Sequence, residues 1–118
     1  MTRSTQEVFD SHREAIETGD FEKLAGDYAE DAILVTLDGT YTGREAILRD
    51  FFQSQMGQFT DLTINFENTA VEDDMCVLQW SATAKEGSVP HGVGVFVIQD
   101  GLIQRQGEWF QLQLNQAD

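Results

Sequence analysis

Apolar residues recur at helical spacing in the first half of the chain. Over residues 5–18 they fall on one face, which predicts an amphipathic helix that ends at Gly19. Ser4 precedes this helix at the spacing of a capping box. The same periodicity predicts a second, short helix over residues 21–29 and a third over residues 44–56.

Outside these helices, apolar and polar residues mostly alternate, which predicts strands with one buried face. Asp38-Gly39 and Asp100-Gly101 have the composition of tight hairpin turns. The strands expected on either side of these and other turns cover residues 32–37, 40–42, 62–67, 76–84, 89–99 and 102–114.

This order of elements, helices first and then a run of hairpin-joined strands, is typical of the α+β class. We expect the three helices of the N-terminal half to cover one face of a strongly curved antiparallel sheet. The length of 118 residues fits a single domain, residues 1–118.

The net charge of the chain limits the classes of partner that it is expected to bind. Seven basic residues against 21 acidic residues give a net charge of −14, which disfavours nucleic acid and anionic membranes. The single cysteine, Cys76, excludes an internal disulfide. Residues 1–4 have no apolar signal core, and no apolar run is long enough to span a bilayer, so we expect a cytoplasmic protein.

Four segments in the order seen here resemble a known superfamily. The chain is similar to the SnoaL-like and ketosteroid-isomerase-like branch of the nuclear transport factor 2-like superfamily from about residue 5 to about residue 112. The segments that carry the resemblance are the helix–Gly-Asp–helix string at 12–24, the strand entry at 28–32, the helix at 43–52 and the hairpin at 96–103.

The resemblance implies a cone-shaped fold of the cystatin-like α+β roll type. A curved sheet would wrap the first helix and leave an apolar pocket between sheet and helices, and dimers would form through the outer face of the sheet. The superfamily includes isomerases, dehydratases, polyketide cyclases, epoxide hydrolases and non-catalytic binding modules. The fold alone therefore does not determine the function.

The catalytic positions of ketosteroid isomerase are not matched here. With the opening motif aligned at residues 19–20, the oxyanion tyrosine of the isomerase falls on His12. Its general-base aspartate falls on Thr36, and its second oxyanion acid falls near Gly94. A threonine cannot act as a general base at neutral pH, so the isomerase reaction itself is not supported.

Two other residues are candidates for acid–base chemistry. His12 lies on an apolar helix face and would act as an acid, base or oxyanion donor; the alternative is a hydrogen-bonded interior histidine. Glu108 shares an apolar strand face with Gln106 and would be a base of raised pKa in the pocket. Alternatively this face is solvated or lies in a dimer interface, or a β-bulge turns Arg105 and Trp109 inward instead.

Aromatic and polar residues on the predicted elements are the ligand-binding candidates. For most of the aromatic residues, packing in the core is the competing explanation. The candidates are Tyr28, Thr36, Phe52, Trp80, Phe96, Gln106 and Phe110.

The remaining polar and glycine positions suggest no further chemistry. Neither His12 nor His91 has neighbours at metal-ligand spacing, so no metal site is predicted. His91 has the strand parity of Val93 and is expected on the outer face. Gly92 and Gly94 lie inside a predicted strand and indicate a close backbone approach or a bend.

Three functional hypotheses follow. In the first, the pocket binds a small hydrophobic or cyclic metabolite and performs cofactor-independent acid–base chemistry, as an isomerase, cyclase or dehydratase. In the second, the protein is a non-catalytic homodimeric module for ligand binding or scaffolding. The third is a dehydratase or hydrolase variant of the same fold, which would need a second pocket carboxylate beside a histidine that the sequence does not locate.

Overall fold

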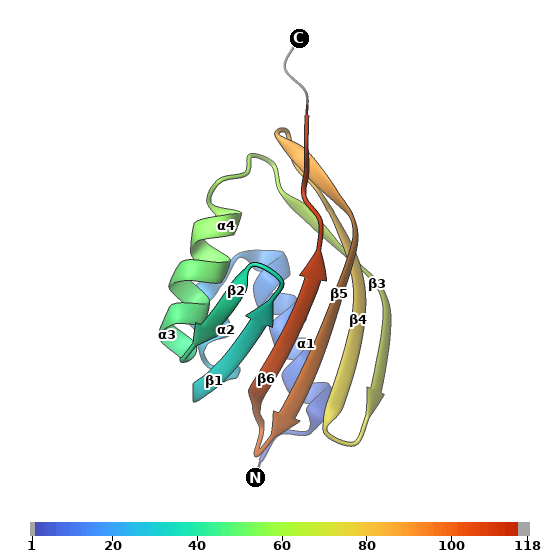
Figure 1. The fold of residues 1–118 in the computed structure, drawn as a ribbon. Coiled ribbons are helices and arrows are strands. Elements are labelled where there is room, and N and C mark those ends of the chain that lie inside the picture. The colour runs from blue at the N-terminus through green and yellow to red at the C-terminus, as the bar shows by residue number, and fades with distance from the viewer. Residues whose placement is uncertain (1, 116–118) are drawn as a thin grey trace.

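A computed structural model describes residues 2–115 of the chain. The helices gather on one side of a strongly curved sheet, with α1 behind the strands and the α3–α4 segment beside β2 (Figure 1). The helical elements are α1 (Thr5–Thr18), α2 (Phe21–Ala25), α3 (Arg44–Ala46), the π-helix η1 (Ile47–Gln53) and α4 (Ser54–Met56). The strands are β1 (Tyr28–Thr36), β2 (Gly39–Thr42), β3 (Thr63–Glu72), β4 (Met75–Thr83), β5 (Gly87–Gln99), β6 (Leu102–Phe110) and β7 (Gln113–Leu114).

The strands form one sheet in the order β2-β1-β6-β5-β4-β3, with β7 paired to β5. This confirms the α+β class and the curved sheet. The sheet is mixed rather than purely antiparallel, because β1 and β6 run parallel while the other neighbours are antiparallel. The β3–β6 meander brings the last long strand back beside the first one, a pairing that no local pattern specifies.

The first helix has the bounds and caps that its sequence predicts. The Ser4 side chain accepts from the backbone of Glu7, and the Glu7 carboxylate accepts from the backbone of Ser4, which completes the capping box. Gly19 ends the helix in the left-handed conformation, with φ 69°. The face turned toward the sheet buries Val8, Phe9, His12 and Ala15.

The second helix is shorter than predicted, and the first strand begins earlier. The helix ends at Ala25, and Tyr28 already belongs to β1. The main-chain oxygen of Asp27 accepts a hydrogen bond from Ile103 N at 2.7 Å, which pulls the chain out of the helix and onto β6. A contact between residues so far apart in sequence overrides the helical periodicity of residues 21–29.

The third predicted helix exists, but its centre is widened into a π-helix. Residues Ile47–Gln53 form the wide segment, which α3 and α4 continue on either side. Within it the consecutive Phe51 and Phe52 are both buried, and their rings meet edge to face with centroids 4.9 Å apart. Such π-turns often occur at functional sites.

The last predicted strand is interrupted. The strand β6 ends at Phe110, and the two residues of β7 pair with Gly87 and Ser88 at the start of β5. Near its other end, β6 also carries a bulge, because the register changes from Val97↔Arg105 to Ile98↔Ile103.

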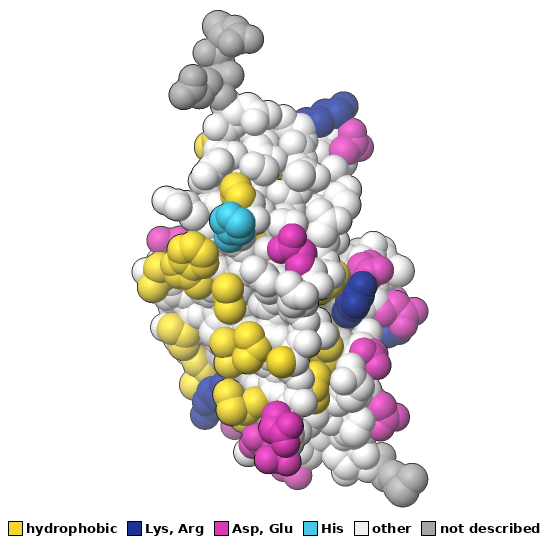
Figure 2. All heavy atoms as spheres, turned by 90° about the vertical axis from the view of Figure 1, so that its right-hand side faces the viewer, with side chains coloured by type: hydrophobic (Ala, Val, Ile, Leu, Met, Phe, Trp, Pro, Cys, Tyr) yellow, Lys and Arg dark blue, Asp and Glu magenta, His cyan; other side chains and the backbone are white. Residues whose placement is uncertain are grey.

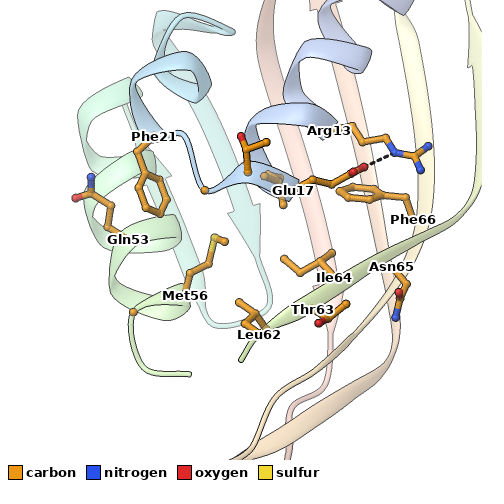
Figure 3. Close-up of a pocket in the computed structure, with 14 residues that line it drawn as sticks. Arg13, Glu17, Phe21, Gln53, Met56, Leu62, Thr63, Ile64, Asn65 and Phe66 are labelled. Carbon is orange, nitrogen blue, oxygen red and sulfur yellow. Dashed lines mark hydrogen bonds and ion pairs between the residues drawn. The ribbon is translucent and has the colours of Figure 1, made fainter. Parts of the chain in front are cut away.

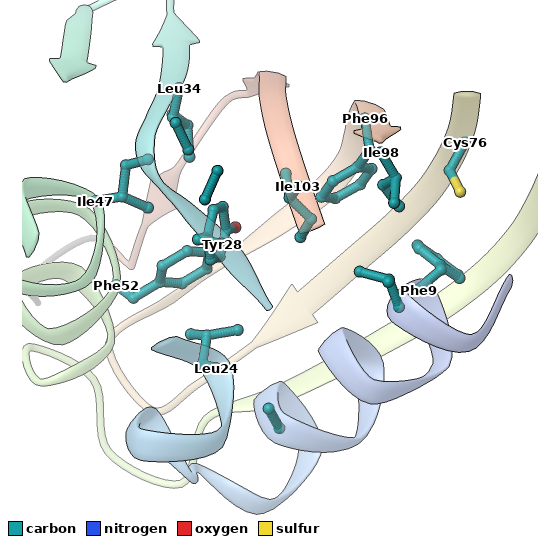
Figure 4. Close-up of a cluster of buried hydrophobic side chains, with 14 of the residues drawn as sticks. Phe9, Leu24, Tyr28, Leu34, Ile47, Phe52, Cys76, Phe96, Ile98 and Ile103 are labelled. Atoms are coloured by element: carbon teal, nitrogen blue, oxygen red, sulfur yellow. The ribbon is translucent and has the colours of Figure 1, made fainter. Parts of the chain in front are cut away.

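The hydrophobic core lies between α1, the η1 helix and the concave face of the sheet (Figure 4). Phe9 on α1 contacts Phe96 on β5 edge to face, with ring centroids 5.8 Å apart. Tyr28, Leu34 and Ile103 are completely buried where β1 meets β6. Among the residues that the structure describes, no helix combines the length and the hydropathy that crossing a bilayer requires.

Candidate functional site

A cavity of about 130 Å³ lies on the concave side of the sheet, between α1, the η1–α4 segment and strands β3 to β6. Its walls are almost entirely apolar, with aromatic side chains from helix, loop and sheet. The polar side chains among them are those of His12, Gln55, Gln106 and Glu108, and the aromatic ones are those of Phe51, Phe52, Phe59, Phe66, Trp80, Phe96 and Phe110.

Glu108 is the acidic group of this cavity. The indole Nε1 of Trp80 donates to its Oε1 at 3.1 Å, and the amide Nε2 of Gln106 donates to its Oε2 at 2.8 Å. Burial raises the pKa of Glu108 from 4.5 to about 7, although the hydrogen bonds from Gln106 and Trp80 act in the opposite direction. Glu108 is 9% exposed, and its two donors, an amide and an indole, are neutral groups. Among the residues that the structure describes, no lysine or arginine lines the cavity.

A buried tyrosine orients the amide that holds Glu108. The Tyr28 hydroxyl donates to Gln106 Oε1, so the NH₂ end of the amide is directed at Glu108. Tyr28 is fully buried, and burial together with the charge of Glu108 raises the pKa of its phenol well above 10.0. The hydroxyl therefore stays protonated and keeps the amide in this orientation.

His12 lies on α1 and lines the same cavity. Its ring contacts Phe96 with centroids 5.1 Å apart and also meets the edges of Tyr28 and Phe52. Burial lowers the pKa of His12 from 6.5 to about 3, so the imidazole is neutral at neutral pH. Its Nδ1 is buried and has no hydrogen-bond partner among the described residues.

Two glycines on β5 lie beneath the Trp80 and Glu108 side chains. Gly92 is the register partner of Trp80 on β4, and Gly94 is the register partner of Glu108 on β6. A Cβ atom at either position would overlap the facing side chain. The close backbone approach predicted from these glycines is therefore present.

Most of the residues predicted for the site do line the cavity. They are His12, Phe52, Trp80, Phe96, Gln106, Glu108 and Phe110. The bulge in β6 leaves Glu108 on the concave face, while Arg105 and Trp109 stay outside, Trp109 being 45% exposed. Glu108 is therefore buried on the face that lines the cavity, and its role as a base stays a prediction.

Two of the predicted ligand-binding residues lie elsewhere. Tyr28 is behind Gln106 and does not line the cavity. The Thr36 hydroxyl accepts from Asp38 N and Gly39 N, each at 3.1 Å, and so stabilises the turn between β1 and β2. Thr36 therefore has a local structural role, and alignment with a distant family position was a misleading guide to its surroundings.

Some lining residues were not found from the sequence. Phe59 follows α4 in a segment without regular periodicity, so no pattern marked it. Gln55 and Met56 lie at the end of the predicted third helix, on a face that the helical pattern did not assign to a pocket.

An open groove adjoins the cavity (Figure 3). It has a volume of about 820 Å³ and runs between the end of α1, the start of α2, α4 and β3. At its rim, Arg13 Nε donates to Glu17 Oε1 at 2.7 Å, and the guanidinium lies 5.1 Å from the Phe66 ring centroid. The side chains that line both the cavity and the groove are Ile16, Met56, Leu62, Ile64 and Phe66.

The described residues contain no group of three or more histidine, cysteine or carboxylate side chains placed to hold a metal ion. Cys76 is buried, and burial raises the pKa of its thiol to about 11. The titratable side chains described in the cavity wall are the Glu108 carboxyl group and the neutral His12 imidazole.

A curved α+β sheet with helices and a small apolar cavity on its concave side is the arrangement that the resemblance to the nuclear transport factor 2-like superfamily implies. Residues 9–106 match the model of the SnoaL-like domain, so the chain belongs to the SnoaL-like family. No curated protein matches it significantly.

Solved structures share the fold at low sequence identity. A putative ketosteroid isomerase from Kribbella flavida is 17% identical, with a TM-score of 0.79 over 100% of this chain and 87% of that one. IdmH, a putative polyketide cyclase from Streptomyces antibioticus, is 18% identical, with a TM-score of 0.79 over 92% and 93% of the two chains. An epoxide hydrolase of the LEH-like type from M. tuberculosis is 13% identical, with a TM-score of 0.73 over 91% and 82%.

Proposed function

We propose that the protein binds a small, uncharged, hydrophobic cyclic molecule in the inner cavity and that Glu108 exchanges a proton with it without a cofactor. The observation that carries this proposal is a single carboxyl group of pKa about 7 in an apolar cavity. A general base works best when its pKa lies near the operating pH. Two similar structures are named as a putative ketosteroid isomerase and a putative polyketide cyclase, and acid–base chemistry on a cyclic ligand is compatible with both names.

The reaction starts with the ionised carboxylate of Glu108. It removes a proton from a carbon next to a carbonyl group, and the C–H electron pair becomes that of an enolate. The protonated Glu108 then returns a proton to the same carbon, or to the γ carbon when a C=C bond is conjugated with the enolate, so the carboxylate is regenerated. His12, as a neutral imidazole, supplies an N–H donor for the enolate oxygen.

The charge of the cavity restricts its ligand. Its lining residues include Glu108 but no arginine or lysine, and His12 is uncharged at neutral pH. An anionic ligand would therefore be buried without a counter-ion beside a carboxylate. The cavity volume of about 130 Å³ suits one ring, since an engineered apolar cavity of about 150 Å³ takes up benzene.

Proton exchange provides the test. Cyclohexanone, a single-ring ketone, would be incubated with the protein in D₂O, and loss of the proton signals next to the carbonyl followed by NMR. We expect wild type to accelerate exchange and Glu108→Gln to lose roughly 100-fold or more of that acceleration. Glu67→Gln is the matched control, because Glu67 is exposed on β3.

Each outcome separates binding from catalysis. The ketone could perturb the resonances of cavity residues while its protons exchange at the buffer rate with wild type and with every variant. In that case the catalytic role of Glu108 is wrong, and the result supports a non-catalytic binding module. If neither cyclohexanone nor a panel of larger cyclic ketones perturbs those resonances, the pocket proposal itself fails.

The alternative function, a homodimeric binding or scaffold module, is favoured by the outer face of the sheet. Hydrophobic side chains gather there (Figure 2). Met75 and Val77 on β4, Val93 on β5 and Trp109 on β6 are all exposed. Val93 and Trp109 are register partners, and Met75 and Val77 pair with Val97 and Val95 on β5. An apolar sheet face of this kind suits a second copy of the chain.

Assembly can be tested independently of the pocket. Sedimentation velocity of the wild type is expected to show a dimer, and the double substitution Val77→Lys with Val93→Lys to shift it to monomer. A monomeric wild type at about 100 μM would rule out the homodimer, since stable interfaces hold well below that concentration.

A further inference from the structure

Two successive inward-facing positions of β5 are glycines, so this part of the strand presents only backbone to the cavity. Gly92 and Gly94 occupy them, whereas Phe96 and Ile98 fill the next two with large buried side chains. Trp80 on β4 and Glu108 on β6 lie on opposite sides of this bare strip. Their side chains bridge β5 and form a hydrogen bond between strands that are not neighbours.

Steric space, and not backbone conformation, explains why glycine is required at these two positions. Neither has a positive φ, so an L-residue could adopt either backbone conformation. A Cβ atom at Gly94 would overlap Glu108 Oε2 and lie 3.0 Å from the carboxyl carbon. A Cβ atom at Gly92 would overlap the Trp80 indole and lie 2.6 Å from each of two further ring carbons.

We propose that Gly92 and Gly94 are positioning residues that determine where the Glu108 carboxylate lies in the cavity. Gly94 leaves room for Oε2, the oxygen that accepts from Gln106. Gly92 leaves room for the indole whose N–H holds Oε1. The catalytic consequence of this positioning rests on the proposed function, but the positioning itself does not.

A third strand glycine offers a matched control. Gly107 lies on β6 next to Glu108, and a Cβ atom built there has no neighbour within 4 Å. Gly107→Ala therefore carries the same chemical change, in the same sheet, without an overlap.

The first measurement is a double-mutant cycle by urea unfolding. Gly94→Ala is expected to lower the folding equilibrium constant at least about tenfold in the wild-type background, because the carboxyl group must move. In a Glu108→Ala background the same substitution is expected to cost less than about threefold, and Gly107→Ala to cost equally little in both backgrounds. Equal costs of Gly94→Ala in both backgrounds would overturn the proposal.

The second measurement reports position rather than stability. The pKa of Glu108 is obtained from the pH dependence of its carboxyl ¹³C resonance. Displacement by Gly94→Ala removes the hydrogen bond from Gln106 while the group stays in the apolar cavity, so we expect the Glu108 pKa to rise by about one unit or more. Gly107→Ala should leave it unchanged, and a Gly94→Ala value equal to wild type would contradict the assignment.

A Gly94→Ala variant that does not fold would also test the proposal. If Gly94→Ala is unfolded but Gly94→Ala with Glu108→Ala is folded, the overlap with the carboxyl group is the cause and the proposal holds. If both are unfolded, the glycine is needed for another reason and the proposal is wrong. A wild type without ketone exchange but with the expected Gly94→Ala shift would refute the proposed function alone.

A substitution at Gly92 tests the hydrogen bond from Trp80, the second donor to Glu108, in the same way. Gly92→Ala is expected to displace the Trp80 indole, remove its hydrogen bond to Oε1 and raise the Glu108 pKa. In a Trp109→Phe background the remaining tryptophan fluorescence comes from Trp80 and reports the displacement directly. Unchanged emission and an unchanged pKa would show that Gly92 has no positioning role.

Discussion

The indole Nε1 of Trp80 and the carboxylate of Glu108 meet at 3.1 Å although a whole strand, β5, separates the strands that carry them. Both donors of the carboxylate, this indole and the Gln106 amide, are neutral. A cationic partner would have kept the pKa of Glu108 low, whereas neutral donors in an apolar cavity leave it near 7.

Stability should therefore fall as the pH rises through the range that Glu108 titrates. Its folded-state pKa is raised from 4.5 to about 7, so the folded state holds the proton more tightly and the contribution is fully present below about pH 4.5. From about pH 5 to about pH 8 the wild type should lose up to about 3 kcal/mol that Glu108→Gln does not lose. Urea unfolding of both proteins measures this, and parallel pH profiles would show that Glu108 ionises normally.

The contribution of His12 to stability should have the opposite pH dependence. Its pKa is lowered from 6.5 to about 3, so the neutral form stabilises the fold above pH 6.5 and this contribution is lost as the pH falls toward about 3. As the pH falls from about 6.5 to about 5, the stability of the wild type relative to His12→Leu should decrease by roughly 2 kcal/mol. The exposed His91 provides the control, and His91→Leu should follow the wild type.

Tyr28→Phe should destabilise the protein and also raise the pKa of Glu108. Loss of the hydroxyl leaves Gln106 Oε1 without its donor, at a cost of about 1–2 kcal/mol, and the freed amide no longer holds the carboxylate. Tyr41→Phe is the control, because Tyr41 packs against the same core, whereas the donor to Gln106 is Tyr28. Thermal unfolding measures the loss of stability, and the ¹³C titration of Glu108 measures its pKa. An equal shift of the Glu108 pKa in both variants would argue against the role of Tyr28 in orienting Gln106.

Arg3→Met should be more destabilising than a typical surface substitution. Arg3 donates to Asp27 Oδ1 at 2.9 Å and to the Gly101 carbonyl at 2.9 Å, and Asp27 is 1% exposed. Without Arg3 the buried carboxylate keeps, among the described residues, the Ser11 hydroxyl as its side-chain donor, so we expect a loss of roughly 3 kcal/mol.

Arg49→Met is the comparison for Arg3→Met. Arg49 pairs with Glu45 and Asp50 in an exposed network, which should contribute much less to stability because solvent screens it. Equal losses for the two arginines in denaturant unfolding would mean that the Asp27 site does not stabilise the N-terminal segment.

Local features were predictable because their causes are local. The capping box at Ser4, the left-handed Gly19 and the turn at Asp100-Gly101 each depend on a few adjacent residues, and each is found as expected. The helix predicted over residues 21–29 was wrong at its end, because the hydrogen bond from Ile103 N to the Asp27 carbonyl comes from the far end of the chain.

The sequence by itself determined the α+β class, the helix and hairpin positions and the presence of an acid on an apolar strand, since periodicity and turn composition act over a few residues. Only the tertiary structure decided which face of β6 lines the cavity, through a bulge at Gln104 that reverses the strand parity. It also decided that Trp80 and Glu108 meet over Gly92 and Gly94. These contacts join strands by sheet order and register, which depend on the packing of the whole chain.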